Sequence, residues 1–369
     1  MSAAGIIAIT MPKWGLSMQE GKVMEWLAEE GASLKPGDPV MDIETEKIAN
    51  TFEALDSGIL RRKIAQVDDV LPIGALLGVL APAAVDDAAI DAFIAEFQAN
   101  YVPPEVDEAE GESGWAFVDV DGYRLRYARM GDGAKNIVLI HGFGGDADRW
   151  AFTQEPLAAQ ASVYAFDLPG HGQSTKAVAD GSVAALADVV IAFMDALDIA
   201  SATLIGHSLG GAIALQAAIA HPARVDALAL IAPAGLGQAI NTTYLDGFIT
   251  CDNRKEMKVL LQQLVADPEL VNRNLVNDML QFKRIDGVPV ALQTIADGFR
   301  DTSGQTVDLR AGLAGLQMPI KVIWGAADAI IPATHADGLP GNVEVHVLPG
   351  LGHLVQLEAV TEVNALLGV

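Results

Sequence analysis

The sequence predicts a multidomain protein in which a small all-β sandwich precedes a larger α/β domain with a helical cap. Residues 1–80 consist of short β-type runs broken by Gly and Pro turns. Residues 115–369 alternate Val- and Ile-rich runs with helical patterns, which is typical of buried parallel strands joined by helices. A highly acidic stretch separates the two regions. The 369 residues suffice for two hydrophobic cores.

The composition argues against several classes of function. The chain carries 23 Lys and Arg against 48 Asp and Glu, a formal net charge of −25, which disfavours binding to nucleic acids and to anionic membranes. Its single cysteine, Cys251, cannot close an intrachain disulfide, which fits a reducing compartment. The N-terminus has no basic signal region, and no apolar run approaches the roughly 20 residues of a membrane span. We therefore expect a cytoplasmic protein.

The first region contains a faint internal repeat. Residues 32–43 and 69–80 align at an offset of 37, which pairs Gly37 with Gly74. The repeat predicts a sandwich of two similar halves. The segment that joins them, MDIETEKIANTFEA, has a β-prone run on each side of its charged centre and therefore predicts a hairpin with Lys47 at the tip.

Around this hairpin the sequence resembles a known family. The pattern LKPGDPVMDIETEKIANTFEA is similar to that of the lipoyl domains of 2-oxo acid dehydrogenase complexes, and the resemblance covers roughly residues 5–80. It implies that Lys47 carries an amide-linked lipoyl group, attached by a lipoate ligase. Biotin carrier domains share the fold but place their lysine between methionines, whereas Glu46 and Ile48 flank Lys47. Without the surrounding pattern, the Glu-Lys pair would be an ordinary charged hairpin tip.

A connector is predicted over residues 81–114, which contain nine carboxylates, three prolines and no Lys or Arg. Such a composition is typical of a solvated, self-repelling tether. Within it, Ile90, Phe93, Ile94 and Phe97 follow helical spacing, which predicts an amphipathic helix. The sequence leaves open whether the apolar stripe packs on one of the chain's own domains or on another subunit.

The most informative motif in the second region is Gly206-His207-Ser208-Leu209-Gly210. It follows the strand-like run ATLI and precedes the helical run AIALQAAIA, which is the context of a nucleophile elbow. The glycines relieve the crowding of a sharp turn that lifts Ser208 above the sheet. Its hydroxyl then lies at a helix N-terminus, where negative charge is favoured. We therefore predict that Ser208 is the catalytic nucleophile.

A catalytic serine needs a general base and an acid that orients the base. Asp328 follows the run KVIWG and His353 follows the run VEVHVL, so both come after late strands and in the chain order Ser, Asp, His. We predict that Asp328 fixes the tautomer of His353, which moves the proton of Ser208. Asp167 and Asp337 are alternatives for the acid, but neither combines this order with a position directly after a strand.

Two backbone N–H groups are needed for an oxyanion hole. We assign them to Leu209, which follows the nucleophile, and to Phe143 in the HGFGG loop. Together with the DLPGHGQS loop, these motifs resemble the α/β-hydrolase family over residues 115–369. The histidines have no metal-ligand spacing, and we expect no metal site.

Helical stretches interrupt the strand and helix alternation over about residues 237–312 and predict a cap over the site. Its apolar residues either line an acyl pocket or pack inside the cap, and the sequence does not decide between these roles. They are Leu260, Leu261, Leu264, Met279 and Phe282.

The two halves on one chain resemble the dihydrolipoyllysine-residue acetyltransferase components of acetoin dehydrogenase complexes, in which a lipoyl domain precedes an α/β-hydrolase-type domain. The chain lacks the H-x-x-x-D-G motif of the usual acyltransferase core of 2-oxo acid complexes. The resemblance implies transfer of an acetyl group from S-acetyl-dihydrolipoyl-Lys47 to coenzyme A in acetoin catabolism. It also implies two partner enzymes, one that cleaves acetoin with thiamine diphosphate and a dihydrolipoamide dehydrogenase. We further expect a homo-oligomeric core.

Several mechanisms remain open from the sequence. Ser208 either forms an acetyl-enzyme that coenzyme A attacks, or the domain positions coenzyme A for direct attack by its thiol. A serine hydrolase or thioesterase that carries a lipoyl domain would instead release acid regardless of coenzyme A. A noncatalytic scaffold would not depend on Ser208.

Overall fold

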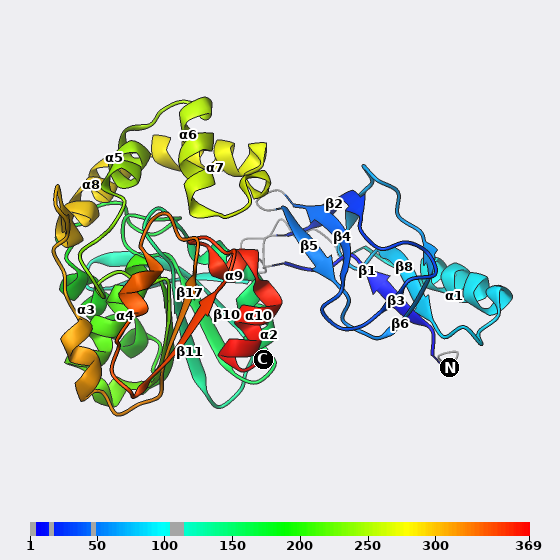
Figure 1. Cartoon of the computed structure of the whole chain (residues 1–369), viewed down its shortest axis with the longest axis horizontal. Helices are drawn as coiled ribbons and strands as arrows, with labels where there is room; N and C mark the ends of the chain where they lie inside the picture. The colour runs from blue at the N-terminus through cyan, green and yellow to red at the C-terminus, as the bar shows by residue number, and fades with distance from the viewer. Residues whose placement is uncertain (1–4, 15–17, 46–48, 104–113) are drawn as a thin grey trace. The chain divides into compact units, whose positions relative to one another are not determined.

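The computed structural model describes residues 5–14, 18–45, 49–103 and 114–369. The chain divides into two compact units, Met1–Ser113 and Gly114–Val369, and Figure 1 shows both. No helix in the described ranges combines the length and the apolar character that a membrane crossing requires.

The first unit is a β-sandwich. Among its described residues one sheet has the order β1-β8-β6-β3 and the other the order β5-β4-β2-β7, with neighbouring strands antiparallel. Buried aliphatic side chains from both sheets form its core. The strands are β1 Ile7–Thr10, β2 Glu20–Trp26, β3 Ser33–Leu34, β4 Pro39–Glu44, β5 Ala49–Glu53, β6 Gly58–Lys63, β7 Val70–Pro72 and β8 Leu76–Ala81.

Each half of the internal repeat contributes to both sheets, since β3 and β4 begin within residues 32–43 and β7 and β8 begin within residues 69–80. Strands β4 and β8 begin 37 residues apart, and each is the second strand of its sheet. Gly37 and Gly74 precede them with φ angles of +89° and +79°, which L side chains rarely adopt. The repeat in the sequence therefore marks two equivalent tight turns.

Helix α1 (Asp87–Asn100) packs on this sandwich. Ile90 is fully buried in a cluster with residues of β8, and Tyr101 donates a 2.7 Å hydrogen bond to a backbone carbonyl of the sandwich. Arg61 of β6 forms a 2.8 Å ion pair with the first turn of the helix. The amphipathic pattern thus serves internal packing. The predicted tether over 81–114 is wrong for its first part, because residues 81–101 belong to the packed unit.

We expect Ile90→Ala to lower the free energy of unfolding of the first unit by about 2–5 kcal/mol, because it leaves a cavity under α1. Leu55→Ala is the matched control, since Leu55 in the same unit is 77% exposed and should change stability by less than about 0.5 kcal/mol. Chemical denaturation, monitored by hydrogen exchange of the sandwich, measures the free energy of unfolding of both variants. Equal effects of the two variants would show that α1 contributes no packing.

The second unit contains an eight-stranded sheet with the order β18-β17-β14-β13-β11-β12-β10-β9. The six strands from β18 to β12 are parallel, and β10 and β9 form an antiparallel edge. Asp121 and Gly122, with φ angles of +44° and +85°, form the turn between β9 and β10. The strands are β9 Trp115–Val120, β10 Tyr123–Met130, β11 Asn136–Ile140, β12 Ser162–Phe166, β13 Ala202–His207, β14 Val225–Ile231, β17 Ile320–Gly325 and β18 Val343–Leu348.

Helices cover both faces of this sheet (Figure 1). Alternate residues of β11 point to opposite sides, so that Val138 and Ile140 join the core under α3 and α4, whereas Leu139 joins the core under α2 and α10. The strands therefore read as continuous apolar runs, because both of their faces are buried. The helices are α2 Ala151–Ala158, α3 Val183–Ala196, α4 Leu209–Ala220, α9 Val355–Glu358 and α10 Val360–Leu367.

Four further helices form a cap beyond the carboxyl ends of the parallel strands, at the top of Figure 1. They are α5 Thr242–Thr250, α6 Arg254–Leu261, α7 Arg273–Arg284 and α8 Val288–Phe299, followed by the short pair β15 Arg300–Asp301 and β16 Gly304–Gln305. The carboxyl edge of a parallel sheet is where α/β proteins place their ligands, so the cap covers the edge on which a site is expected.

Candidate active site

Ser208 lies in a sharp turn between β13 and α4. Its φ of +55° and ψ of −118° place a non-glycine residue in a strained conformation. A Cβ atom at Gly206 would lie 2.2 Å from the Gly210 carbonyl oxygen, and one at Gly210 would lie 2.2 Å from the Ile140 carbonyl oxygen. Both positions therefore require glycine, and the close backbone packing holds Ser208 in its strained conformation.

Asp328 and His353 are brought together by the loops after β17 and β18. His353 Nδ1 lies 2.7 Å from Asp328 Oδ2, and both side chains are almost completely buried. The other carboxylate oxygen accepts hydrogen bonds from the N–H groups of Ile330 (2.8 Å) and Ile331 (2.9 Å). Burial opposes ionisation of Asp328, but the charge of His353 and these hydrogen bonds outweigh it, so the pKa of Asp328 lies below its ordinary value.

The backbone of His353 is held from two directions. Its carbonyl oxygen lies 3.0 Å from His207 Nε2, in the elbow itself. Its N–H donates a 2.9 Å hydrogen bond to the carbonyl of Leu264, in the cap. Burial lowers the pKa of His207 to about 3, so this imidazole is neutral and donates through Nε2. The elbow and the cap therefore fix the position of the base together.

The two N–H groups predicted for an oxyanion hole lie beside Ser208. Leu209 is the first residue of α4, where helix N–H groups have no intrahelical partner. Phe143 follows Gly142, at which an added Cβ would come within 3.0 Å of Ser208 Cβ. Neither N–H donates to another group of the described part of the chain. Both are therefore available to a ligand oxygen.

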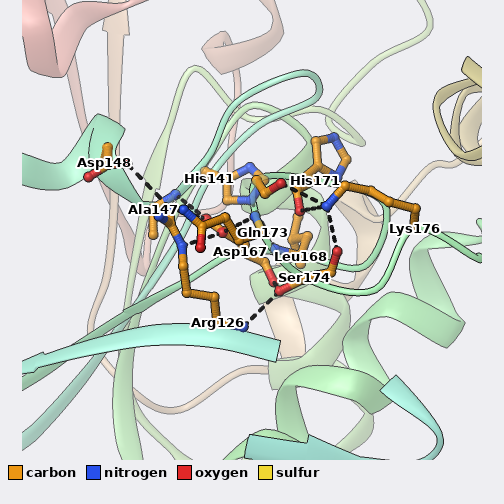
Figure 2. A network of polar contacts seen from close by, with 11 residues as sticks. Arg126, His141, Ala147, Asp148, Asp167, Leu168, His171, Gln173, Ser174 and Lys176 are labelled. Carbon is orange, nitrogen blue, oxygen red and sulfur yellow. Dashed lines mark hydrogen bonds and ion pairs between the residues drawn. The ribbon is translucent and has the colours of Figure 1, made fainter. Parts of the chain in front are cut away.

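Two buried histidines, His141 and His171, hold the loop that carries Phe143, and both are labelled in Figure 2. His171 Nε2 accepts the Gly144 N–H at 3.0 Å, and His141 Nε2 accepts the Leu168 N–H at 3.0 Å. Burial lowers the pKa of His141 to about 4 and that of His171 to about 3, so both rings stay neutral and can accept. The HGFGG and DLPGHGQS loops are thereby tied to each other.

Asp167, one of the alternatives for the catalytic acid, has a structural role. It is fully buried and forms an ion pair of 2.6 Å with Arg126, and it accepts the Ala147 N–H at 2.8 Å (Figure 2). Asp337, the other alternative, is exposed on the surface. Neither contacts His353, so Asp328 is the acid that the geometry supports.

A pocket beneath the cap joins these groups. Its wall contains Ser208 and His353 together with Phe143 and the glycines of its loop. Of the five apolar cap positions that the sequence singled out, Leu261, Leu264 and Met279 line the pocket, whereas Leu260 and Phe282 pack elsewhere. The sequence analysis missed two polar residues of this wall, Arg149 and Tyr244. No motif marks either of them.

Lys47 lies outside the described residues, but the strands around it are described. The register of β4 and β5 pairs Glu44 with Ala49, so the segment between them connects the ends of two paired strands. Within the described ranges, no three His, Cys, Asp or Glu side chains form a cluster that could hold a metal ion.

The geometry defines a nucleophile elbow with a histidine and a carboxylate on a capped α/β sheet. The sequence correspondingly matches the family described as "alpha/beta hydrolase fold" over residues 135–360 and the family "Biotin-requiring enzyme" over residues 7–80. It is 46% identical over 362 residues to the dihydrolipoyllysine-residue acetyltransferase component of the acetoin cleaving system of Cupriavidus necator, covering 98% of this chain and 96% of the relative. The component of the same name from Pseudomonas putida is 48% identical, and the match covers 97% of this chain and 96% of that relative. The chain belongs to this acetyltransferase component family.

Solved structures share the fold of the larger unit. The meta-cleavage product hydrolase from Pseudomonas fluorescens superposes with a TM-score of 0.63 at 23% identity, covering 68% of this chain and 95% of that one. The 2-hydroxy-6-oxo-6-phenylhexa-2,4-dienoate hydrolase from Rhodococcus gives 0.62 at 23% identity, covering 69% and 96%. At this identity the likeness concerns the fold alone.

We expect Asp328→Asn to lower kcat about 10⁴-fold, because the amide no longer favours the tautomer in which His353 Nε2 accepts the serine proton. Asp337→Asn is the control, since that carboxylate is exposed and distant from His353, and it should change kcat by less than about twofold. Steady-state acetyl transfer measures both. A loss below tenfold in Asp328→Asn would contradict the assignment.

We expect Asp167→Asn to lower the free energy of unfolding by about 3–5 kcal/mol, because it leaves the Arg126 charge buried without its closest partner. Asp195→Asn breaks the exposed Asp195–Arg224 pair and should cost no more than about 1 kcal/mol. Urea denaturation of the two variants gives the comparison. Similar losses would mean that the buried pair does not stabilise the oxyanion loop region.

Proposed function

We propose that this chain transfers an acetyl group from S-acetyl-dihydrolipoyl-Lys47 to coenzyme A in acetoin cleavage, and that Ser208 carries the acetyl group between them. The observation that supports this most strongly is the union on one chain of a lipoyl-type sandwich and a capped site with Ser208, His353 and Asp328. The relatives that span nearly the whole chain carry the corresponding name.

Lipoate attached at Lys47 supplies a dithiol that carries the acetyl group as a thioester. In the first half-reaction Ser208 Oγ attacks the thioester carbonyl while His353 Nε2 takes the hydroxyl proton. The N–H groups of Phe143 and Leu209 receive the negative charge that develops on the carbonyl oxygen. The carbon–sulfur bond then breaks, and His353 returns the proton to the departing sulfur.

The second half-reaction runs the same steps with coenzyme A. His353 takes the thiol proton, the sulfur attacks the acetyl carbon on Ser208, and the carbon–oxygen bond breaks as the proton passes to Ser208 Oγ. Asp328 keeps His353 in one orientation and stabilises the imidazolium in both halves. At the end, Ser208 and His353 have regained their starting protonation states. The thiol of coenzyme A has lost one proton, and the dihydrolipoyl thiol has gained one.

The pocket supports a small acyl group. The pocket volume is about 40 Å³, and one water molecule needs roughly 10–15 Å³, so the pocket holds about three water-sized groups. An acetyl group has three non-hydrogen atoms. The cap limits the entry of water to the acetyl-enzyme, and Leu264 ties the cap to the base at the His353 N–H.

We further propose the enzymes with which the chain works. An enzyme that cleaves acetoin with thiamine diphosphate would load the arm at Lys47, a dihydrolipoamide dehydrogenase would reoxidise it, and a lipoate ligase would attach it. A homo-oligomeric core would bring several arms to several acyl sites. The relatives' printed name, a component of an acetoin cleaving system, supports the existence of such partners.

We expect Ser208→Ala to reduce the formation of acetyl-coenzyme A from acetyl-dihydrolipoamide by at least about 10³-fold, since it removes the nucleophile. Product analysis separates this proposal from the alternatives. A serine hydrolase would release acetate at the same rate with and without coenzyme A. Transfer at the wild-type rate by Ser208→Ala would show that the domain only positions coenzyme A for direct attack.

The carrier half is tested at Lys47. In the variant Lys47→Arg we expect transfer from free acetyl-dihydrolipoamide to continue, because the acyl site is intact, while turnover of acetoin by the reconstituted complex is lost. Intact mass after expression with lipoate and its ligase should show one lipoyl increment in the wild type and none in the variant. A lipoyl increment that persists in Lys47→Arg would place the arm on another residue.

A further inference from the structure

Two polar side chains of the active-site pocket have no part in the mechanism above. Arg149 and Tyr244 line the same cavity as Ser208 and His353. The remaining side chains of the wall beneath the cap are almost entirely apolar. They include Phe143, Leu245, Phe248, Met279, Phe299 and Ile330.

Arg149 is a half-buried cation without a compensating carboxylate. Its Nη2 lies 3.8 Å from the Met279 sulfur, and within the described part of the chain it forms no ion pair. Arg126 provides the contrast, because it is paired with both Asp167 and Asp148. A guanidinium beside an apolar cavity is screened less than one in bulk solvent, so its field acts more strongly on groups in that cavity.

Tyr244 as a whole is 4% exposed and lines the pocket, and none of the described residues hydrogen-bonds its hydroxyl. Burial raises the pKa of Tyr244 above its ordinary value, and the charge of Arg149 opposes this rise. The phenol is therefore a proton donor, and Arg149 lies within electrostatic reach of it. The hydroxyl is not among the fully buried polar atoms of the described residues that have no partner, so it keeps access to the pocket and can donate a hydrogen bond to a ligand there.

We propose that Arg149 and Tyr244 form a subsite for the sulfur of the reacting thiol, and that the charge of Arg149 directs the acetyl group to thiols rather than to water. This inference rests on the function proposed above. Both half-reactions pass negative charge onto sulfur, first on the departing dihydrolipoyl thiol and then on the attacking thiol of coenzyme A. The guanidinium and the phenol are donors of the pocket wall that belong neither to the oxyanion hole nor to the group of Ser208, His207 and His353.

The thiol of coenzyme A and water, the two acceptors of the acetyl group, differ in pKa. An ordinary thiol has a pKa near 8.5 and water one near 15.7, so a neighbouring cation produces a useful fraction of thiolate but almost no hydroxide. His353 still takes the thiol proton and passes it to Ser208, and the carbon–sulfur bond forms as the carbon–oxygen bond breaks. Arg149 stabilises the sulfur during this exchange and is unchanged at its end.

The test is the ratio of acetyl-coenzyme A to acetate formed from the acetyl-enzyme. This ratio does not depend on how fast the acetyl-enzyme forms. We expect Arg149→Met to lower it roughly tenfold or more, because an opposite charge nearby shifts a pKa by about 1–3 units. Arg149→Lys should restore most of the ratio, and Tyr244→Phe should lower it by a smaller factor. Arg254→Met, which removes an exposed cap arginine, is the control and should leave the ratio unchanged.

Two further acceptors identify the cause of the effect. Pantetheine lacks the phosphates of coenzyme A and should show the same loss in Arg149→Met, whereas a loss confined to coenzyme A would mean that Arg149 binds phosphate. An arenethiol that is already ionised at neutral pH should show little loss. An equal loss with coenzyme A and the arenethiol, or an unchanged ratio in Arg149→Met, would overturn the thiolate subsite. The Ser208→Ala result tests the proposed function separately and would still stand.

Discussion

The acyl-transfer site depends on the close approach of three backbone segments at Ser208. The end of β13, the start of α4 and the end of β11 meet so tightly that Gly206 and Gly210 have no space for a Cβ atom. This packing sustains the strained φ of Ser208, which no isolated turn would adopt. It also brings the Phe143 loop next to the serine, and within the described part of the chain the first N–H of α4 donates to no other group. The nucleophile and both donors thus follow from one constraint.

The base and the cap are connected to the same point. His207 holds the carbonyl of His353 from the elbow, while Leu264 accepts its N–H from the cap. The position of His353 therefore depends on the position of the cap, because a backbone hydrogen bond connects them. In the proposed acetyl-enzyme mechanism this coupling matters, because the element that shields the acetyl group from water also positions the base.

The local parts of this account were predictable from the sequence, and the long-range parts were not. A nucleophile elbow needs glycines within a few residues of Ser208, and the order of strands places Asp328 and His353 at the same sheet edge, where they lie 2.7 Å apart. In contrast, two features depend on which distant residues meet. They are the packing of α1 on the sandwich and the lack of an ion-pair partner for Arg149 among the described residues. Arg126, for example, takes Asp148, the neighbour of Arg149, as a partner.

The most direct measurement is rapid quenching of the wild-type chain with acetyl-dihydrolipoamide, followed by mass spectrometry of its peptides. If Ser208 carries the acetyl group, the peptide that contains Ser208 gains one acetyl group before any acetyl-coenzyme A forms. On addition of coenzyme A, this acetyl group disappears at the rate at which acetyl-coenzyme A appears. Transfer at the full rate with no acetyl group on this peptide at any time would contradict this role of Ser208.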